Sequence, residues 1–408
     1  MSTATIPFTY TVRNQHGAKV SGTIEAESAA AVARRLKAMG YAPIEINAPK
    51  TMQRELSIPG FGPKVKLKDL AIFSRQFATM INSGLSLLRS LNILVDQSDN
   101  PLLKKTLREC RIAIEQGGAL SSSMSGHPDV FPPLMVNMIK AGEVGGFLDS
   151  TLMQIAENYE KEVKLRSKIK SAMTYPVVVF CIAIFAVVVM LLFVVPTFGS
   201  IFKSLGGTLP APTQLLVTLS VYLKIGIAPL VVLAMGLLFG WKKVRHTERA
   251  HRIVDPLRLK IPVFGPLFQK VALARFTRNF GTMLRSGVPI LQSLDIVADT
   301  SGNVVIADAV RDVQSSVRKG ESITAPLSKH EIFPSMVQQM MAVGEETGAL
   351  DDMLHKISDF YDQEVEATTE SLTALIEPIM IMVLGSLIGG MIVALYLPIF
   401  KVFNLVNG

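Results

Sequence analysis

The sequence predicts an all-α membrane protein with two repeated cytoplasmic six-helix bundles and three transmembrane helices, preceded by a small α+β module. Three observations predict this fold class. Hydrophobic residues make up 49% of the 408-residue chain. Apolar runs long enough to cross a bilayer follow polar segments of helical periodicity. Much of the first half of the chain recurs in the second half, so we expect each repeat to be a soluble bundle with its own membrane anchor.

The repeat covers residues 73–198 and again residues 276–400. The first copy opens with Phe-Ser-Arg-Gln-Phe and the second with Phe-Thr-Arg-Asn-Phe, and each continues to a Ser-Gly pair. Further along, a Gly-Glu pair, a single glycine and a Leu-Asp pair recur in the same order. Their distance from the opening motif is one residue shorter in the second copy. The two copies therefore differ by one residue in a loop and otherwise keep their spacing.

Residues 1–50 are predicted to form the α+β module. Apolar and polar residues alternate as in strands at 8–12 and 20–24, with a turn at 14–17 between them, and a helix and a third short strand follow. Residues 51–66 contain prolines and glycines with little periodicity, so we expect a linker there.

Residues 67–172 and 269–373 are predicted to form the two bundles, because apolar residues recur at helical spacing between glycine and proline breaks. The last helix of each bundle, near 149–176 and 351–378, is uninterrupted up to its proline. We expect each of these helices to run directly into the bilayer. The first of them carries two i,i+4 pairs of favourable orientation, Glu157 with Lys161 and Glu160 with Lys164.

Membrane spans are predicted at 173–197, 214–241 and 375–400. Five Lys or Arg residues precede the first span and five follow the second, whereas the loop at 197–212 contains one. Positive charge marks the cytoplasmic side, so the N-terminus and both bundles are expected in the cytoplasm and the C-terminal tail outside. The middle span brings the chain back to the cytoplasmic side. The two repeats therefore have the same orientation and are related by an axis along the membrane normal.

Two helix corners, at 142–146 and 344–348, have a Gly-Glu start and a glycine end. Neither is followed by Lys-Ser/Thr, which argues against a phosphate-binding loop. One interpretation is a turn in which glycine takes a positive φ and the glutamate caps or pairs locally. The other is a partner-facing corner, or a divalent-ion site with Asp149 or Asp351. The candidate partner-facing residues, with the arginine of each first helix, are Arg75, Gly142, Glu143, Gly146, Arg278, Gly344, Glu345 and Gly348.

The last span contains features that suggest packing or coupling inside the membrane. Glu377 is an acidic residue near its cytoplasmic end, and such a residue is a functional candidate because burying its charge in a bilayer is costly. Small residues four apart would let another helix approach closely, either from this chain or from a second copy. The candidates for membrane packing or coupling are Pro176, Glu377, Pro378, Gly385 and Gly389.

No catalytic constellation is evident, so we expect a protein that is not an enzyme and has no cofactor and no metal. The six histidines are scattered without metal-ligand spacing. The formal net charge of +8 comes largely from clusters beside apolar runs, which is typical of cytoplasmic membrane flanks, so we expect no nucleic-acid binding.

The chain contains Leu-Ala-Ile-Phe-Ser-Arg-Gln at 70–76, Ser-Ala-Met-Thr-Tyr-Pro at 171–176, the two Gly-Glu corners, Ile-Glu-Pro at 376–378 and Leu-Pro-Ile-Phe at 397–400. Together these segments resemble the inner-membrane platform family shared by type IV pilus systems (PilC-like) and type II secretion systems (GspF-like). The N-terminal module, with Gly-Thr-Ile-Glu-Ala-Glu at 22–27, is more similar to the pilus members.

The resemblance implies a multi-pass platform in the bacterial inner membrane, homodimeric or larger. It would couple a cytoplasmic hexameric assembly ATPase, and where present a retraction ATPase, to the insertion or removal of pilin subunits, beside inner-membrane alignment proteins. Two alternatives stay open: a platform for a type II secretion pseudopilus, and a membrane adaptor for another cytoplasmic ATPase.

Overall fold

The structure is a computed structural model that describes residues 6–13, 19–26, 29–38, 42–47, 64–204, 209–244 and 247–406. The chain divides into two compact units, residues 1–64 and residues 65–408. The turn expected at 14–17 and the linker residues 51–63 lie outside the described residues.

The first unit is a three-stranded antiparallel sheet with one helix. The strand order is β2-β1-β3, with a register irregularity between Thr11 and Val12. The helix contacts β2 and β3, and it buries Val32 and Leu36, which lie four residues apart on one face. Its elements are β1 (Ile6–Arg13), β2 (Lys19–Ala26), α1 (Ala29–Ala38) and β3 (Ala42–Asn47).

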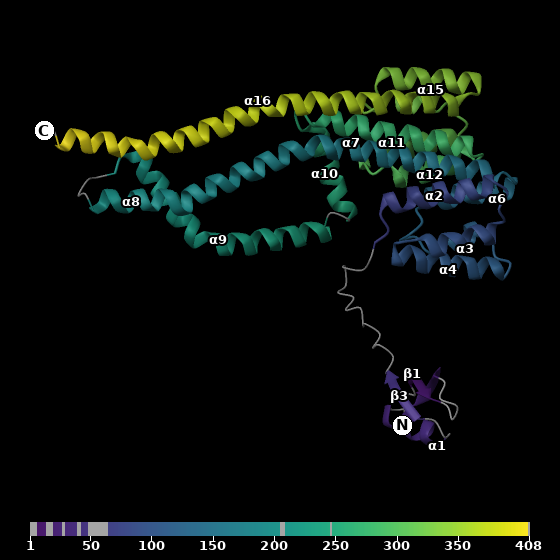
Figure 1. Ribbon diagram of the computed structural model, residues 1–408. Coiled ribbons are helices and arrows are strands. Elements are labelled where there is room, and N and C mark those ends of the chain that lie inside the picture. The colour runs from purple at the N-terminus through teal and green to yellow at the C-terminus, as the bar shows by residue number, and fades with distance from the viewer. Residues whose placement is uncertain are drawn as a thin grey trace. The chain divides into compact units, whose positions relative to one another are not determined.

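The second unit contains the two repeats, and each forms a bundle whose last helix extends far beyond it (Figure 1). The first repeat consists of α2 (Leu67–Asn82), α3 (Leu87–Gln97), α4 (Pro101–Glu115), α5 (Leu120–Ser125), α6 (Pro133–Gly145) and α7 (Leu148–Val189). The second repeat consists of α11 (Gly265–Arg285), α12 (Ile290–Thr300), α13 (Val304–Arg318), α14 (Thr324–Leu327), α15 (Ser335–Thr347) and α16 (Leu350–Val406).

Aromatic rings occupy matching places in the cores of the two bundles. The ring of Phe73 lies 5.6 Å from that of Phe77 and 5.9 Å from that of Phe131. In the second bundle Phe276 lies 5.8 Å from its neighbour on α11 and 5.3 Å from Phe333. All of these side chains are buried, and they belong to one hydrophobic core that continues from one bundle into the other. The bundles are therefore packed together rather than linked as separate bodies.

The helix α7 is continuous across Pro176 and then passes through a short π-helical segment, η1 (Met190–Val194), into α8 (Val195–Ser204). The helix α16 is 57 residues long and includes Pro378 and Pro398. Both leave their bundles in the same direction (Figure 1). At the far end, η1 and the start of α8 pack on α16 through Leu191, Val195, Met391 and Leu395.

Two stretches, Leu148–Ile201 and Leu350–Pro398, are long and apolar enough to cross a membrane. Only 11% and 22% of their most apolar windows is buried within the protein, which fits a lipid environment better than the core of a soluble domain. Over the range predicted for the middle span the structure has a single helix, α9 (Ala211–Val244). Its crossing of the membrane stays a prediction.

The helix α8 continues to Ser204, inside the stretch 197–212 that the sequence predicts to be a loop. A further helix has no counterpart in the elements expected from the sequence. It is α10 (Glu248–Lys260), which lies between α9 and the second bundle and contains a proline among charged residues. Its buried Asp255 accepts a hydrogen bond from the backbone N–H of Val304 at 3.1 Å. This contact holds α10 against the first turn of α13.

Candidate functional site

The Gly-Glu corners have the same geometry in both repeats. At Gly142 an added Cβ would lie 2.7 Å from Thr151 Oγ1, and at Gly344 it would lie 2.9 Å from Leu350 Cα. The first glycine of each corner thus lets two consecutive helices pack closely. The last glycine is left-handed, with φ of 74° at Gly146 and 70° at Gly348, as a helix C-terminus requires when the chain turns sharply.

The glutamates of the corners cap the short helix that comes earlier in each bundle. The Glu143 carboxylate accepts hydrogen bonds from the backbone N–H groups of Leu120 and Ser121, at 2.6 and 2.9 Å. The Glu345 carboxylate accepts from the N–H of Ile323 at 2.8 Å and from the Ser322 hydroxyl at 3.0 Å. Both glutamates therefore hold local structure, and contact with another protein at these corners stays a prediction.

The arginine of each first helix pairs with a carboxylate on the last helix of the same bundle. Arg75 binds Glu160 through two nitrogens, at 2.7 and 2.6 Å, and this partner lowers the pKa of Glu160. In the second bundle Arg278 pairs with Asp362, the residue at the matching position. Arg75 is partly exposed, whereas the Arg278 side chain is only 3% exposed. Arg278 is covered by this chain itself, so in this conformation it does not face a partner protein.

What covers Arg278 is α7 of the first repeat, which brings Glu162 into an ionic cluster. Glu162 Oε1 lies 2.7 Å from Arg275 and 2.7 Å from Arg166, and its Oε2 lies 3.3 Å from Arg278. Burial raises the pKa of Glu162, but the charges of the three arginines outweigh it and hold the pKa below its usual value. Burial also raises the pKa of Asp362, and Arg278 offsets this only in part. The cluster joins side chains from both repeats.

Other polar contacts extend this inter-repeat interface along α7. The Asn158 amide donates to Asn279 at 3.2 Å and Ser286 donates to Gln154 at 2.7 Å. Nearer the surface Lys161 pairs with Asp359 at 2.6 Å. Further ionic and apolar contacts continue toward the membrane end: Lys168 pairs with Glu366, and Leu165 packs with Leu267, Val365 and Leu372.

Glu162 and Arg275 were not among the residues that the sequence singled out. The only signal of Glu162 in the sequence is a recurrence, because Glu162 precedes Val163 as Glu364 precedes Val365 in the second copy. The signal that could have found the cluster is a difference between the copies, because Arg275 stands where the first repeat has Ile72. A charge present in one copy only suggests a contact that only that copy makes.

The described residues cover the membrane candidates to different extents, and Gly389 is partly buried. Pro176 is buried, whereas Glu377 and Pro378 are exposed. An added Cβ at Gly385 or Gly389 would meet no other atom of the described chain within 4 Å. No described helix of the same chain therefore packs on these two glycines.

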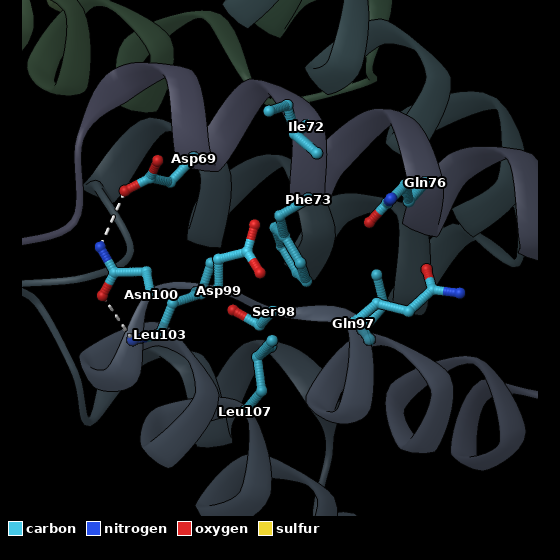
Figure 2. A pocket seen from close by; sticks show the side chains of 11 residues that line it. Asp69, Ile72, Phe73, Gln76, Gln97, Ser98, Asp99, Asn100, Leu103 and Leu107 are labelled. Carbon is cyan, nitrogen blue, oxygen red and sulfur yellow. Dashed lines mark hydrogen bonds between the residues drawn. The ribbon is translucent and has the colours of Figure 1, made fainter.

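A small pocket lies between α2, α3 and α4 (Figure 2). Asp69 at its edge accepts a hydrogen bond from the Asn100 amide at 2.8 Å, and the Asn100 carbonyl oxygen in turn caps α4. Its volume of about 80 Å³ is well below the ~300 Å³ at which ligand pockets begin. Within the described residues, no group of three or more His, Cys, Asp or Glu side chains could hold a metal ion. The inter-repeat interface is therefore the most distinctive polar site of the described structure.

Comparison with known proteins identifies the repeat. Residues 73–196 and 276–398 each match the family described as type II secretion system (T2SS), protein F, and residues 6–47 match its N-terminal domain. The chain is 44% identical to the type IV pilus assembly protein PilC of Myxococcus xanthus, covering 98% of this chain and 95% of the relative. It is 42% identical to PilC of Thermus thermophilus, covering 97% and 98%.

Members named for secretion are also similar to the chain. The type II secretion system protein F of Vibrio cholerae is 32% identical, covering 98% of this chain and 99% of the relative. The duplicated match, the matching N-terminal domain and the near full-length relatives agree with one another. This chain belongs to the type II secretion system protein F family.

Proposed function

We propose that this chain is the inner-membrane platform protein of a type IV pilus assembly machine. One observation carries this proposal. Over nearly the whole chain, identity is 44% and 42% to proteins named for pilus assembly, against 32% to a protein named for type II secretion. A secretion platform is the second candidate because that lower identity still covers nearly the whole chain.

In this role the cytoplasmic bundles engage the assembly ATPase, and the membrane helices meet pilin subunits and the inner-membrane alignment proteins. A retraction ATPase, where the machine has one, uses the same bundles. The continuity of α7 and α16 supports this proposal, because a continuous helix transmits a displacement of a bundle into the bilayer. The shared core and the Glu162 cluster support it as well, since they oblige the two bundles to move together.

The proposal includes a non-enzymatic action. ATP hydrolysis by the motor tilts or turns the paired bundles, and the long helices pass this motion to the site where pilins enter or leave the membrane. The corners remain the proposed motor contact. Their most accessible apolar side chain is Val144, which is 85% exposed beside the capping residue Glu143.

Deletion of the gene in the organism of origin tests the function. We expect loss of surface pili with pilins retained in the inner membrane, normal type II secretion, and restoration by the tagged full-length chain. The tagged chain should also co-purify with the assembly ATPase. Loss of secretion with normal piliation would instead identify a secretion platform. Normal piliation and normal secretion would favour an adaptor for a different ATPase.

A further inference from the structure

Within the chain, α7 of the first repeat packs on the surface that α11 and α16 form in the second repeat. The residues of α11 that it covers lie on one stripe. Asn279 is partly buried, and Thr282 and Ser286 are buried. This face of the second repeat accepts a helix.

Among the described helices of the second unit, none lies on the matching face of the first repeat. The positions equivalent to those three residues are Gln76, Thr79 and Ser83 on α2, and all three are exposed. Beside them, α2 and α7 border an open groove of about 530 Å³ that includes Ile72, whose side chain is 48% exposed. The same surface is therefore occupied in one repeat and open in the other.

The helix α16 has an exposed face that could fill such a groove. On α7 the inserted side chains include Gln154, Asn158 and Leu165, which are buried or partly buried. The equivalent positions on α16 are Lys356, Phe360 and Ala367, which form an exposed stripe. Phe360 is 42% exposed, and one edge of its surroundings is the ring of Tyr361, 5.4 Å away.

At its membrane end the exposed stripe carries a charge opposite to that of the open groove. The groove is lined by Lys68, Lys164 and Lys168 and by the Arg75–Glu160 pair, so its net charge is positive. The stripe of α16 has Lys356 at its bundle end and Glu370 at its membrane end. In the contact within the chain, Lys168 of the inserted helix pairs with Glu366 of the accepting surface. At the equivalent positions the inserted helix would carry Glu370 and the accepting surface Lys164. The acidic and the basic residue exchange sides, but the two charges still attract each other.

We propose that the groove between α2 and α7 binds the exposed stripe of α16 from a second copy of this chain. The contact repeats between molecules the packing that already joins the two repeats within one molecule. The two surfaces in this contact differ, so each of two copies can bind the stripe of the other in its own groove. The two chains then form a closed ring of four repeats. This assembly does not depend on which machine the protein serves.

Disulfide formation between two differently tagged full-length chains in the same membrane tests the proposal. Both chains first receive Cys110→Ala and Cys181→Ala, which removes the native thiols. One chain then carries Ser83→Cys and the other Lys356→Cys, the positions that correspond to the hydrogen-bonded pair Ser286 and Gln154. We expect oxidation to give a cross-linked product that carries both tags.

Three controls make the result interpretable. Gln154→Cys with Ser286→Cys should close a disulfide inside one chain and so report that the fold is intact. Ser122→Cys, exposed but away from the groove, should not cross-link to Lys356→Cys. Lys164→Glu should lower the yield of mixed dimer about twofold to fivefold, the range for an exposed ion pair, and Glu370→Lys in the other chain should restore it.

Absence of the mixed dimer, while the control inside the chain still closes, would overturn the proposal and leave the basic groove to anionic lipid headgroups or another occupant. Ser83→Cys chains that cross-link only to one another would overturn it too, because the groove would then pair with itself.

Discussion

Arg278 on α11 and Glu162 on α7 lie 3.3 Å apart at their side-chain termini, although 116 residues separate them and they belong to different repeats. Both side chains are largely buried, at 3% and 11% exposure. The pair is the centre of the cluster that fixes one bundle against the other. Its environment therefore determines how the platform responds to mutation and to pH.

Replacement of Glu162 should weaken the inter-repeat interface strongly. Glu162→Gln leaves Arg275 and Arg278 buried without their shared carboxylate, and breaking a buried pair in this way costs about 3–5 kcal/mol. Thermal unfolding of the purified chain in detergent measures the loss. The matched control is Glu364→Gln, at the equivalent position of α16, where the pair with Lys270 is more exposed and is worth ~1 kcal/mol or less. Equal losses in the two variants would contradict the assignment.

Lowering the pH should weaken the inter-repeat interface through Glu162. The folded-state pKa of Glu162 is lower than its usual value of 4.5, so the ionised form contributes stability that is present above pH 4.5 and is lost as the pH falls below it. Asp362 acts in the opposite direction, because its pKa is raised by burial. A melting temperature followed from neutral pH downward should fall in the wild type, and the fall should be smaller in Glu162→Gln. Parallel curves would show that other carboxylates dominate.

The first glycine of the corner should tolerate no side chain. In Gly142→Ala the new methyl group would lie 2.7 Å from Thr151 Oγ1 and 3.2 Å from Leu148 Cα, which forces α6 and α7 apart at a cost of about 1–3 kcal/mol. Thermal unfolding again measures the change. Gly126→Ala is the control, because its Cβ would meet only Ser123 O at 3.4 Å. A loss no larger than that of the control would mean that the helices adjust freely.

Two substitutions at the first corner should separate folding from partner binding. Glu143→Ala removes the acceptor of two backbone N–H groups and should destabilise the bundle by about 1–3 kcal/mol. Val144→Asp changes an exposed side chain and should leave the melting temperature unchanged. If the corner contacts the motor, Val144→Asp should still reduce co-purification of the ATPase. Normal recovery of the ATPase would place the motor contact elsewhere.

Reporter fusions should establish the orientation in the membrane. Alkaline phosphatase needs disulfides that form only outside the cytoplasm, so a fusion after Val406 should be active and one after Lys319 in the second bundle inactive. The measurement is enzyme activity normalised to the amount of fusion protein. Activity of both fusions would contradict the predicted topology, including the return of the chain through α9.

Periodic features of the sequence predicted the local structure well. The apolar spacing and the glycine and proline breaks located the helices, and the repeated motifs predicted the duplication that the family match confirms. Local reasoning was less successful for charged side chains. Glu160 was expected to pair with Lys164 along α7, and Lys161 with Glu157. Instead Glu160 binds Arg75 and Lys161 binds Asp359, both on other helices. The helix α10 was missed because its polar composition and internal proline resemble a loop.

The sequence by itself determined the repeat, the helices and their membrane character, because each of these depends on spacing and composition within a short window. Only the tertiary structure decided that α7 lies on the second repeat and that Glu162 meets Arg275 and Arg278 there. The physical reason is that a charged side chain pairs with whatever the packing of distant helices brings within a few ångströms. Two copies of nearly the same motif can therefore differ in exposure: Thr282 is buried, whereas Thr79 at the equivalent position is exposed.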